Sequence, residues 1–380
     1  MRPIFASWLL VWLAACTTPF HPPVFVTGST EFAGIVGLMG ANTPVDVVLV
    51  HGMCTHDDGD ADRAMEEIVG AIDRNVRPPA TSMQAQAQTA ATRIRIYERE
   101  IAAAGSVVRF HALMWSGMTT PLKSQLAYDK TGEPTDCSAV PSAECKPRRA
   151  KYNGQFKDGL LDDCLADAII YQGASHAAIK AEMVAAITRL ANLIGEGDGP
   201  LVLVSASLGS KMTFDALADM LDAAEGSEAK AAARRLSKRL ALLYMEANQL
   251  PILGLADQDV GTLVSSTSVP ASAADGSPAL RVPGSLQRFL SRRAREPQIW
   301  RADDLKIVAF SDPNDLLSFR LIGSRYSAYE RVTIADVLVS NSSTYLGLFE
   351  NPMKAHLGYG LNPDVAFLIA CGRPKSGNCR

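Results

Sequence analysis

The chain has 380 residues, and 37 lysines and arginines against 40 aspartates and glutamates give it a formal net charge of −3. Hydrophobic residues make up 47% and charged residues 20%, a globular composition that excludes a disordered or collagen-like protein. Contacts to nucleic-acid phosphates need a basic excess, which this chain lacks, so no nucleic-acid partner is expected. The length allows one large α/β domain or two smaller ones.

The N-terminus has the pattern of a secretory signal. Arg2 is followed by an apolar run from Ile4 to Leu13 and by small residues before Cys16. Leu13-Ala14-Ala15-Cys16 resembles the lipobox of bacterial lipoproteins, which implies that residues 1–15 are removed and that Cys16 is lipidated. Thr17 follows where an inner-membrane lipoprotein often has aspartate, so the resemblance implies the outer membrane, facing the periplasm or the cell surface. An uncleaved anchor and a plain signal peptide are the alternatives.

The remaining cysteines also indicate export. Apart from Cys16, six are left, an even set that indicates disulfides in an oxidising compartment. Six cysteines allow 15 connectivities, and closeness in sequence favours one of them without excluding the rest. The favoured pairs are Cys137 with Cys145, Cys371 with Cys379, and Cys54 with Cys164.

Strands and helices alternate along residues 45–380, which predicts an α/β fold with a mostly parallel central sheet flanked by helices. Short apolar runs typical of buried strands occupy residues 45–50, 107–115, 201–204, 240–245, 305–310 and 332–339. Residues 16–44 are expected to form the lipidated N-terminus and a tether. Residues 117–165 and 262–300 are expected to form a cap insertion and a loop or lid, because their composition is irregular.

The strand at 201–204 leads through Ser205-Ala206-Ser207-Leu208-Gly209 directly into a helix. This context is the one that a nucleophile elbow requires, with Ser207 held in a strained turn between strand and helix. Small residues two positions before and after the serine let the two backbones approach. Gly209 fits this pattern, whereas Ser205 stands where a glycine is usual.

A serine nucleophile needs a base and a carboxylate that orients the base. The turn around Ser207 resembles that of α/β-hydrolases, in which acid and base both follow the nucleophile along the chain. His356 is the only histidine after Ser207, and it lies in a loop before a final helix. Asp315 and Asp312 both follow the strand at 305–310. Asp315 is preferred as the acid because the two leucines that follow it resemble the hydrolase pattern of an acid followed by an apolar pair, and Asp312 is the alternative.

An oxyanion hole needs two backbone N–H groups that point at the developing negative charge. One is expected from Leu208, directly after the nucleophile. The other is expected from Met53, in the His51-Gly52-Met53 segment that ends the first strand.

The chain thus offers an oxyanion-hole segment, a serine in a strand-to-helix turn, an acid and a histidine, in this order along the sequence. This arrangement resembles the α/β-hydrolase superfamily in its bacterial lipase and esterase branch. The resemblance implies that Ser207 attacks an ester, thioester or amide carbonyl and that His356 acts as base and then as acid. It also implies that Asp315 orients the imidazole. The resemblance does not extend to residues 117–160 or 262–300.

The segment 51–62 contains two histidines and four aspartates, which raises the question of a metal site. Its spacing fits neither an EF-hand loop nor a helical histidine pair. We therefore expect its aspartates to cap the following helix, and we expect no metal and no cofactor.

The leading functional prediction is a serine hydrolase of ester-type bonds, acting through an acyl-enzyme and anchored in the membrane through Cys16. Its expected partners are a small-molecule or lipid ester and the membrane, with no protein partner. Two alternatives stay open: a non-catalytic envelope lipoprotein of the same fold that binds a partner, and an acyltransferase with the same triad.

Overall fold

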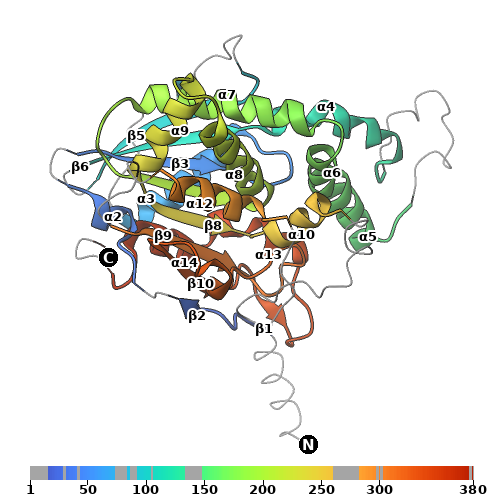
Figure 1. The fold of residues 1–380 in the computed structure, drawn as a ribbon. Coiled ribbons are helices and arrows are strands. Elements are labelled where there is room, and N and C mark those ends of the chain that lie inside the picture. Colours follow the sequence, from blue (N-terminus) through green and yellow to red (C-terminus); the bar gives the residue numbers. More distant parts are fainter. Residues whose placement is uncertain are drawn as a thin grey trace, which may run out of the picture.

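One mixed β-sheet organises the molecule (Figure 1). The computed structural model describes residues 16–28, 31–40, 43–72, 84–85, 92–103, 106–132, 148–259, 282–296, 299, 303–375 and 379. Within them, nine strands lie in the order β2-β10-β9-β8-β7-β3-β6-β5-β4. In that order, their bounds are Val24–Gly28, Val332–Leu338, Leu305–Ser311, Leu240–Glu246, Leu201–Ala206, Val45–Val50, Ser106–Met114, Arg95–Ala103 and Gln84–Ala85.

The strands from β10 to β6 run parallel to one another, and the antiparallel pairings lie at the two edges of the sheet. Helices cover both faces, so the central strands are apolar along their whole length and all of β3 is buried. The α/β prediction with a mostly parallel sheet is confirmed. The six predicted strands correspond to β3, β6, β7, β8, β9 and β10.

Two layers of helices enclose the sheet (Figure 1). One face packs against α2 (Gly34–Leu38), α3 (Asp58–Ile72) and α14 (Pro363–Cys371). The other packs against α7 (His176–Ile194), α8 (Ser207–Asp222), α9 (Glu228–Arg239) and α12 (Ser285–Ala294).

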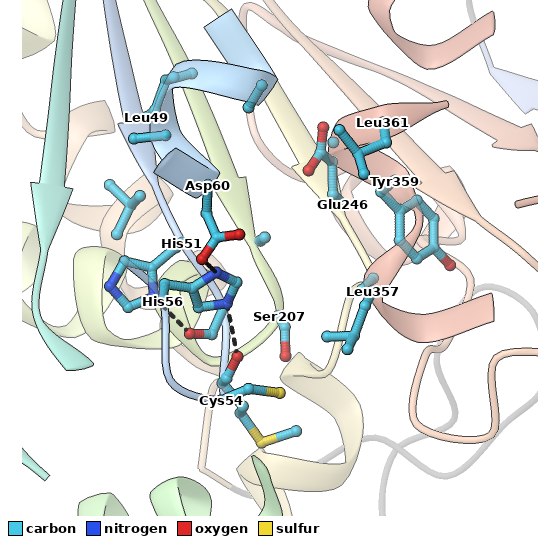
Figure 2. Close-up of a pocket in the computed structure, with 18 of the residues that line it drawn as sticks. Leu49, His51, Cys54, His56, Asp60, Ser207, Glu246, Leu357, Tyr359 and Leu361 are labelled. Carbon is cyan, nitrogen blue, oxygen red and sulfur yellow. Dashed lines mark hydrogen bonds and ion pairs between the residues drawn. The ribbon is translucent and has the colours of Figure 1, made fainter. Parts of the chain in front are cut away.

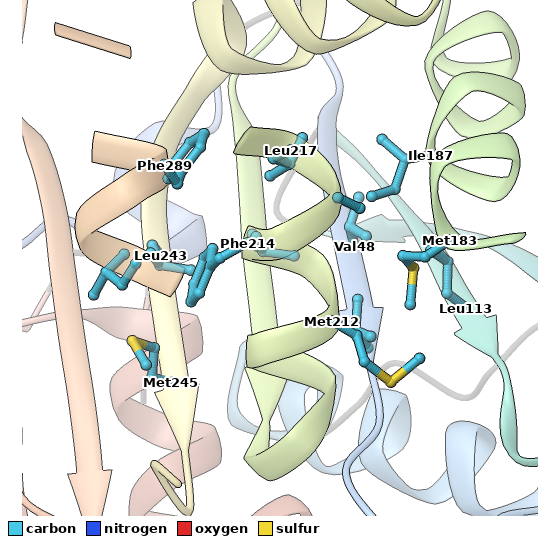
Figure 3. Packing of buried hydrophobic residues seen from close by; sticks show 14 of the residues in the cluster. Val48, Leu113, Met183, Ile187, Met212, Phe214, Leu217, Leu243, Met245 and Phe289 are labelled. Carbon is cyan, nitrogen blue, oxygen red and sulfur yellow. The ribbon is translucent and has the colours of Figure 1, made fainter. Parts of the chain in front are cut away.

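The second face holds a large apolar core (Figure 3). Phe214 of α8 stacks on Phe289 of α12 with ring centroids 5.9 Å apart. Both phenylalanines are fully buried. This packing fixes α8, and with it the first residue of α8, Ser207, at the end of β7.

Short helices lie at the ends and on the connections of the larger elements. They are η1 (Ser116–Met118), α4 (Thr120–Lys123), η2 (Ser124–Asp129), α5 (Lys151–Gln155), η3 (Phe156–Leu165), α6 (Ala166–Gln172), α10 (Leu250–Leu253), η4 (Gly254–Asp257), η6 (Gly323–Tyr326), α13 (Pro352–Leu357) and η7 (Tyr359–Leu361). The helices from η1 to η3 belong to the segment for which a cap was expected, of which residues 133–147 lie outside the described part of the chain.

The prediction of a tether over residues 16–44 is wrong for most of that segment. β2 pairs with β10 as an edge strand, and Ile35 of α2 is fully buried against α14. β1 (Cys16–Thr17) pairs with β11 (Thr344–Tyr345). The short apolar stretches between the prolines and glycines of residues 16–44 are therefore part of the fold.

The prediction of a loop or lid over residues 262–300 is wrong for its second half. Residues 285–294 form α12, whose Leu286, Phe289 and Leu290 are buried in the core. Residues 260–281 lie outside the described residues.

Candidate active site

The predicted site residues lie at the carboxyl ends of the parallel strands, where ligands bind in open α/β sheets. A pocket of about 410 Å³ opens there and is lined by both Ser207 and His356. Figure 2 shows Ser207 between His51, His56 and Asp60 on one side and Glu246, Tyr359 and Leu361 on the other. Apolar side chains form much of its wall, among them Ala61, Ala64 and Ile68 of α3 and Val365, Ala366 and Ile369 of α14.

Ser207 lies in a strained turn. Its φ is +50°, a left-handed conformation that is costly for a residue with a side chain. The turn is possible because two glycines leave room around it. A Cβ on Gly209 would lie 2.2 Å from the carbonyl oxygen of His51, and one on Gly52 would lie 2.8 Å from Cβ of Ser207.

Ser205 is accommodated without the usual glycine. Its side chain is fully buried, and its hydroxyl accepts a hydrogen bond of 2.9 Å from Ser210 Oγ. Ser210 thus pairs the extra hydroxyl and also contacts the carbonyl oxygen of Ser205 at 3.1 Å. The hydroxyl at this position is therefore hydrogen-bonded within the same turn.

His356 and Asp315 are paired directly. His356 Nδ1 lies 3.0 Å from each carboxylate oxygen of Asp315, and both residues are buried. Leu317 N donates to Asp315 Oδ1 at 3.0 Å, and Tyr359 Oη donates to Oδ2 at 3.2 Å. Burial, and next the charge of Asp315, raise the pKa of Tyr359 well above its usual value, so its hydroxyl keeps its proton.

Asp312 lies in the same loop but holds the backbone rather than the imidazole. Its carboxylate accepts from the backbone N–H of Asn341 at 2.7 Å and of Asn314 at 2.9 Å. The Asn341 side chain donates in turn to the carbonyl oxygen of Ala355, next to His356. Asp312 therefore supports the segment that carries the histidine.

The hydroxyl of Ser207 has no hydrogen-bond partner among the described residues, although the side chain is buried. Ser207 and His356 share the pocket without being hydrogen-bonded. Proton transfer between them requires the pair to close, and such contacts are often long before substrate binds.

Of the two expected oxyanion donors, Leu208 directly follows Ser207 and Met53 lines the same pocket. Leu208 is in the first turn of α8, where backbone N–H groups have no partner within the helix. Met53 lines the pocket from the loop after β3. That loop is fixed to the η3 and α6 region by the Cys54–Cys164 disulfide and by a 2.8 Å hydrogen bond from Cys54 N to Asp167.

The disulfides Cys54–Cys164 and Cys371–Cys379 are formed, as favoured from the sequence. Cys137 and Cys145 lie outside the described residues. Cys16 is exposed and is not in a disulfide in the described structure.

His51 has a structural role. Its Nδ1 donates to the carbonyl oxygen of Gly52 at 2.8 Å, its Nε2 accepts from Trp115 N at 3.0 Å, and its ring stacks on that of Trp115. Burial, and then His56, lower the pKa of His51 well below its usual value, so the ring is neutral.

The aspartates of the segment 51–62 are used in the structure. Asp57 and Asp60 accept from each other's backbone N–H at the start of α3. Asp58 pairs with Arg95, and Asp62 pairs with Arg99. Two of these aspartates therefore cap the start of α3, and the other two form ion pairs with arginines of β5.

Glu246 is a pocket residue that the sequence reasoning missed. It is the last residue of β8 and lines the pocket together with Ser207. The sequence could have indicated it, because an acidic residue directly follows the apolar run Leu240–Met245. That position is the carboxyl end of a strand, where the other predicted site residues also lie.

Comparisons with known proteins add little. No model of a known protein family matches the chain, and no curated protein matches it. A solved structure from work on two metagenome-derived lipolytic enzymes, LipS and LipT, aligns with 90% of this chain and 96% of its own length. The identity is 12% and the TM-score is 0.26. Similarity at this level says nothing about activity, and the fold class is evident from the sheet itself.

Proposed function

We propose that this chain is a serine hydrolase that cleaves an ester-type bond (a carboxylic ester, a lipid ester or a thioester) through an acyl-enzyme. The observation that carries the proposal is the 3.0 Å contact of His356 Nδ1 with Asp315, in the pocket where Ser207 lies in a strained strand-to-helix turn. The chain order of serine, aspartate and histidine is that of α/β-hydrolases. The apolar side chains of α3 and α14 suit an acyl chain.

The reaction follows from the positions of these groups. Ser207 Oγ attacks the carbonyl carbon and passes its proton to Nε2 of His356. The N–H groups of Leu208 and Met53 stabilise the oxyanion. The intermediate expels the alcohol or thiol, which takes the proton from His356, and leaves the acyl group on Ser207. Water then attacks the acyl-enzyme by the same route and releases the acid.

Fluorophosphonate labelling tests this proposal, because the reagent reacts with activated serines. We expect the purified, oxidised protein to be labelled, Ser207→Ala to lose the label, and His356→Ala to label far more slowly. Ser205→Ala is the matched control, since it removes a buried hydroxyl from the same turn, and it should still be labelled.

A folded wild type that is never labelled and cleaves no short p-nitrophenyl ester contradicts the proposal. That result favours the non-catalytic binding protein. If labelling succeeds, adding an alcohol acceptor to the ester assay separates hydrolysis from acyl transfer by the product formed.

Anchoring of the chain in the outer membrane through a lipid on Cys16 is the second part of the proposal. Cys16 is exposed and pairs with Tyr345 at the end of β11. The turn that follows exposes Leu346, Leu348 and Phe349, by 85% at Leu348. An exposed apolar turn beside the lipid attachment site suits a membrane surface. Among the helices that the structure describes, none is long and apolar enough to cross a bilayer.

Metabolic incorporation of an alkyne fatty acid in a bacterial host tests the anchor. We expect the full-length chain to take up the label and to fractionate with outer membranes. Cys16→Ser should take up none, whereas Cys371→Ser should still be labelled. A Cys16→Ser variant that keeps the label would exclude Cys16 as the lipidation site.

A further inference from the structure

Glu246 places a carboxyl group in the wall of the pocket, close to the nucleophile. It pairs with Ala206 of β7, the residue directly before Ser207, and with Phe310 of β9. Neighbouring strands are about 4.8 Å apart, so the backbone of Glu246 lies one strand spacing from the turn that carries Ser207. In Figure 2 its carboxyl is drawn near Leu361 and Tyr359, away from the polar residues of the β3 loop.

The carboxyl group has no partner in the described structure. Glu246 is 8% exposed, and no hydrogen bond or ion pair joins its side chain to another described residue. Burial alone raises the pKa of Glu246 to about 7. Other buried carboxyls near the site are bonded, as Asp315 is to His356 and Asp312 is to Asn341.

A largely buried carboxyl to which the described residues offer no partner can gain a hydrogen bond from a donor that enters the cavity it lines. Among the described residues the Glu246 side chain takes part in no hydrogen bond or ion pair, yet it lines the cavity where the substrate is proposed to bind. The missing partner is therefore expected to arrive with the substrate.

We propose that the carboxyl of Glu246 binds a hydrogen-bond donor of the substrate, a hydroxyl or an amine, within a few bonds of the ester carbonyl. The pocket then prefers a short ester that carries such a group to an alkyl ester of the same size. A site built to bond a donor rejects the analogue that lacks it, because its own polar group then stays buried and unpaired. This inference rests on the proposed hydrolase function.

Three ethyl esters of similar size test it: ethyl butanoate, ethyl 3-hydroxybutanoate and ethyl 3-aminobutanoate. For the full-length protein in detergent, we expect kcat/KM to favour the hydroxy or the amino ester by about 10- to 100-fold over ethyl butanoate. Glu246→Leu should abolish that preference. Glu246→Gln should keep a preference for the hydroxy ester and lose one for the amino ester, which distinguishes the two donors.

Leu361→Ala is the matched control, because it enlarges the pocket beside Glu246 without removing a carboxyl. It should change the rates for the three esters without changing their ratio. A wild type that prefers neither polar ester, or a Glu246→Leu variant that keeps the preference, would overturn the inference.

Binding without turnover separates this inference from the proposed function. In the Ser207→Ala background, ligand-observed NMR gives the dissociation constants of the same three esters with and without Glu246→Leu. If no ester is ever hydrolysed but the polar esters bind more weakly after Glu246→Leu, the hydrolase proposal fails and the Glu246 site stands. Equal binding of all three esters with and without Glu246 overturns the site even if hydrolysis is found.

Discussion

Replacing Asp315 by asparagine is expected to lower kcat/KM for a p-nitrophenyl ester by about 10⁴-fold. In the proposed reaction, Asp315 accepts a hydrogen bond from His356 Nδ1, which leaves Nε2 free to accept the proton of Ser207. An asparagine amide can donate to Nδ1 instead, which favours the tautomer with the proton on Nε2. That tautomer cannot act as the base. The side chain has almost the same shape, so the fold should be unaffected.

Asp312→Asn is the matched control, because it makes the same chemical change three residues away in the same buried loop. Asp312 holds the backbone of Asn341, and Asn341 holds the segment of His356, so a small shift of the imidazole is expected. We expect a loss of less than about 100-fold. Steady-state kinetics of both variants, with circular dichroism to verify folding, make the comparison. A larger loss in Asp312→Asn than in Asp315→Asn would reverse the assignment of the acid.

The sequence could predict the parts of the site that depend on local order along the chain. Ser207 was proposed because a tight turn joins an apolar strand to a helix, and His356 because it is the only histidine after that serine, in the chain order that the resemblance to α/β-hydrolases implies. The choice between Asp315 and Asp312 needed the structure. Both are buried within three residues of each other, and only the path of the loop decides which carboxyl meets the imidazole.

The parts that the sequence did not predict depend on long-range pairing. β2 and α2 were read as a tether because prolines and glycines surround them, but β10 and α14 supply their partners from the other end of the chain. β5 was missed because its pattern mixes charged and apolar residues, as suits a strand near the sheet edge. Such segments are fixed by tertiary contacts rather than by local propensity.

Glu246 could not be predicted as a pocket residue for the same reason. An acidic residue at the end of a strand is common, and only the tertiary structure shows that this one is buried in the pocket wall. Its burial has a measurable cost. Burial raises the pKa of Glu246 to about 7 in the folded protein, compared with an ordinary value of 4.5 for an exposed glutamate. Over that window the folded state binds more protons than the unfolded state, so the free energy of unfolding falls as pH rises.

Glu246→Gln replaces the ionisable carboxyl by an amide that does not titrate, and it keeps the shape of the side chain. Relative to wild type, we expect the variant to gain about 3 kcal/mol in free energy of unfolding between pH 4.5 and pH 8, with most of the gain below pH 7. Urea unfolding with the disulfides intact, at several pH values in this range, measures the difference. Contributions from other titrating groups cancel, because both proteins contain them.

Glu225→Gln is the control with the opposite shift. Hydrogen bonds from Arg234, and then from Lys230, lower the pKa of Glu225 to about 2, so most of its titration lies below this window. Its stability relative to wild type should change little between pH 5 and pH 8. If the Glu246→Gln curve is also parallel to wild type, Glu246 ionises freely and the cost of its burial is absent. If the curves diverge as expected, the unpaired carboxyl of Glu246 lowers the stability of the fold. Residues that are retained for function often have such a cost.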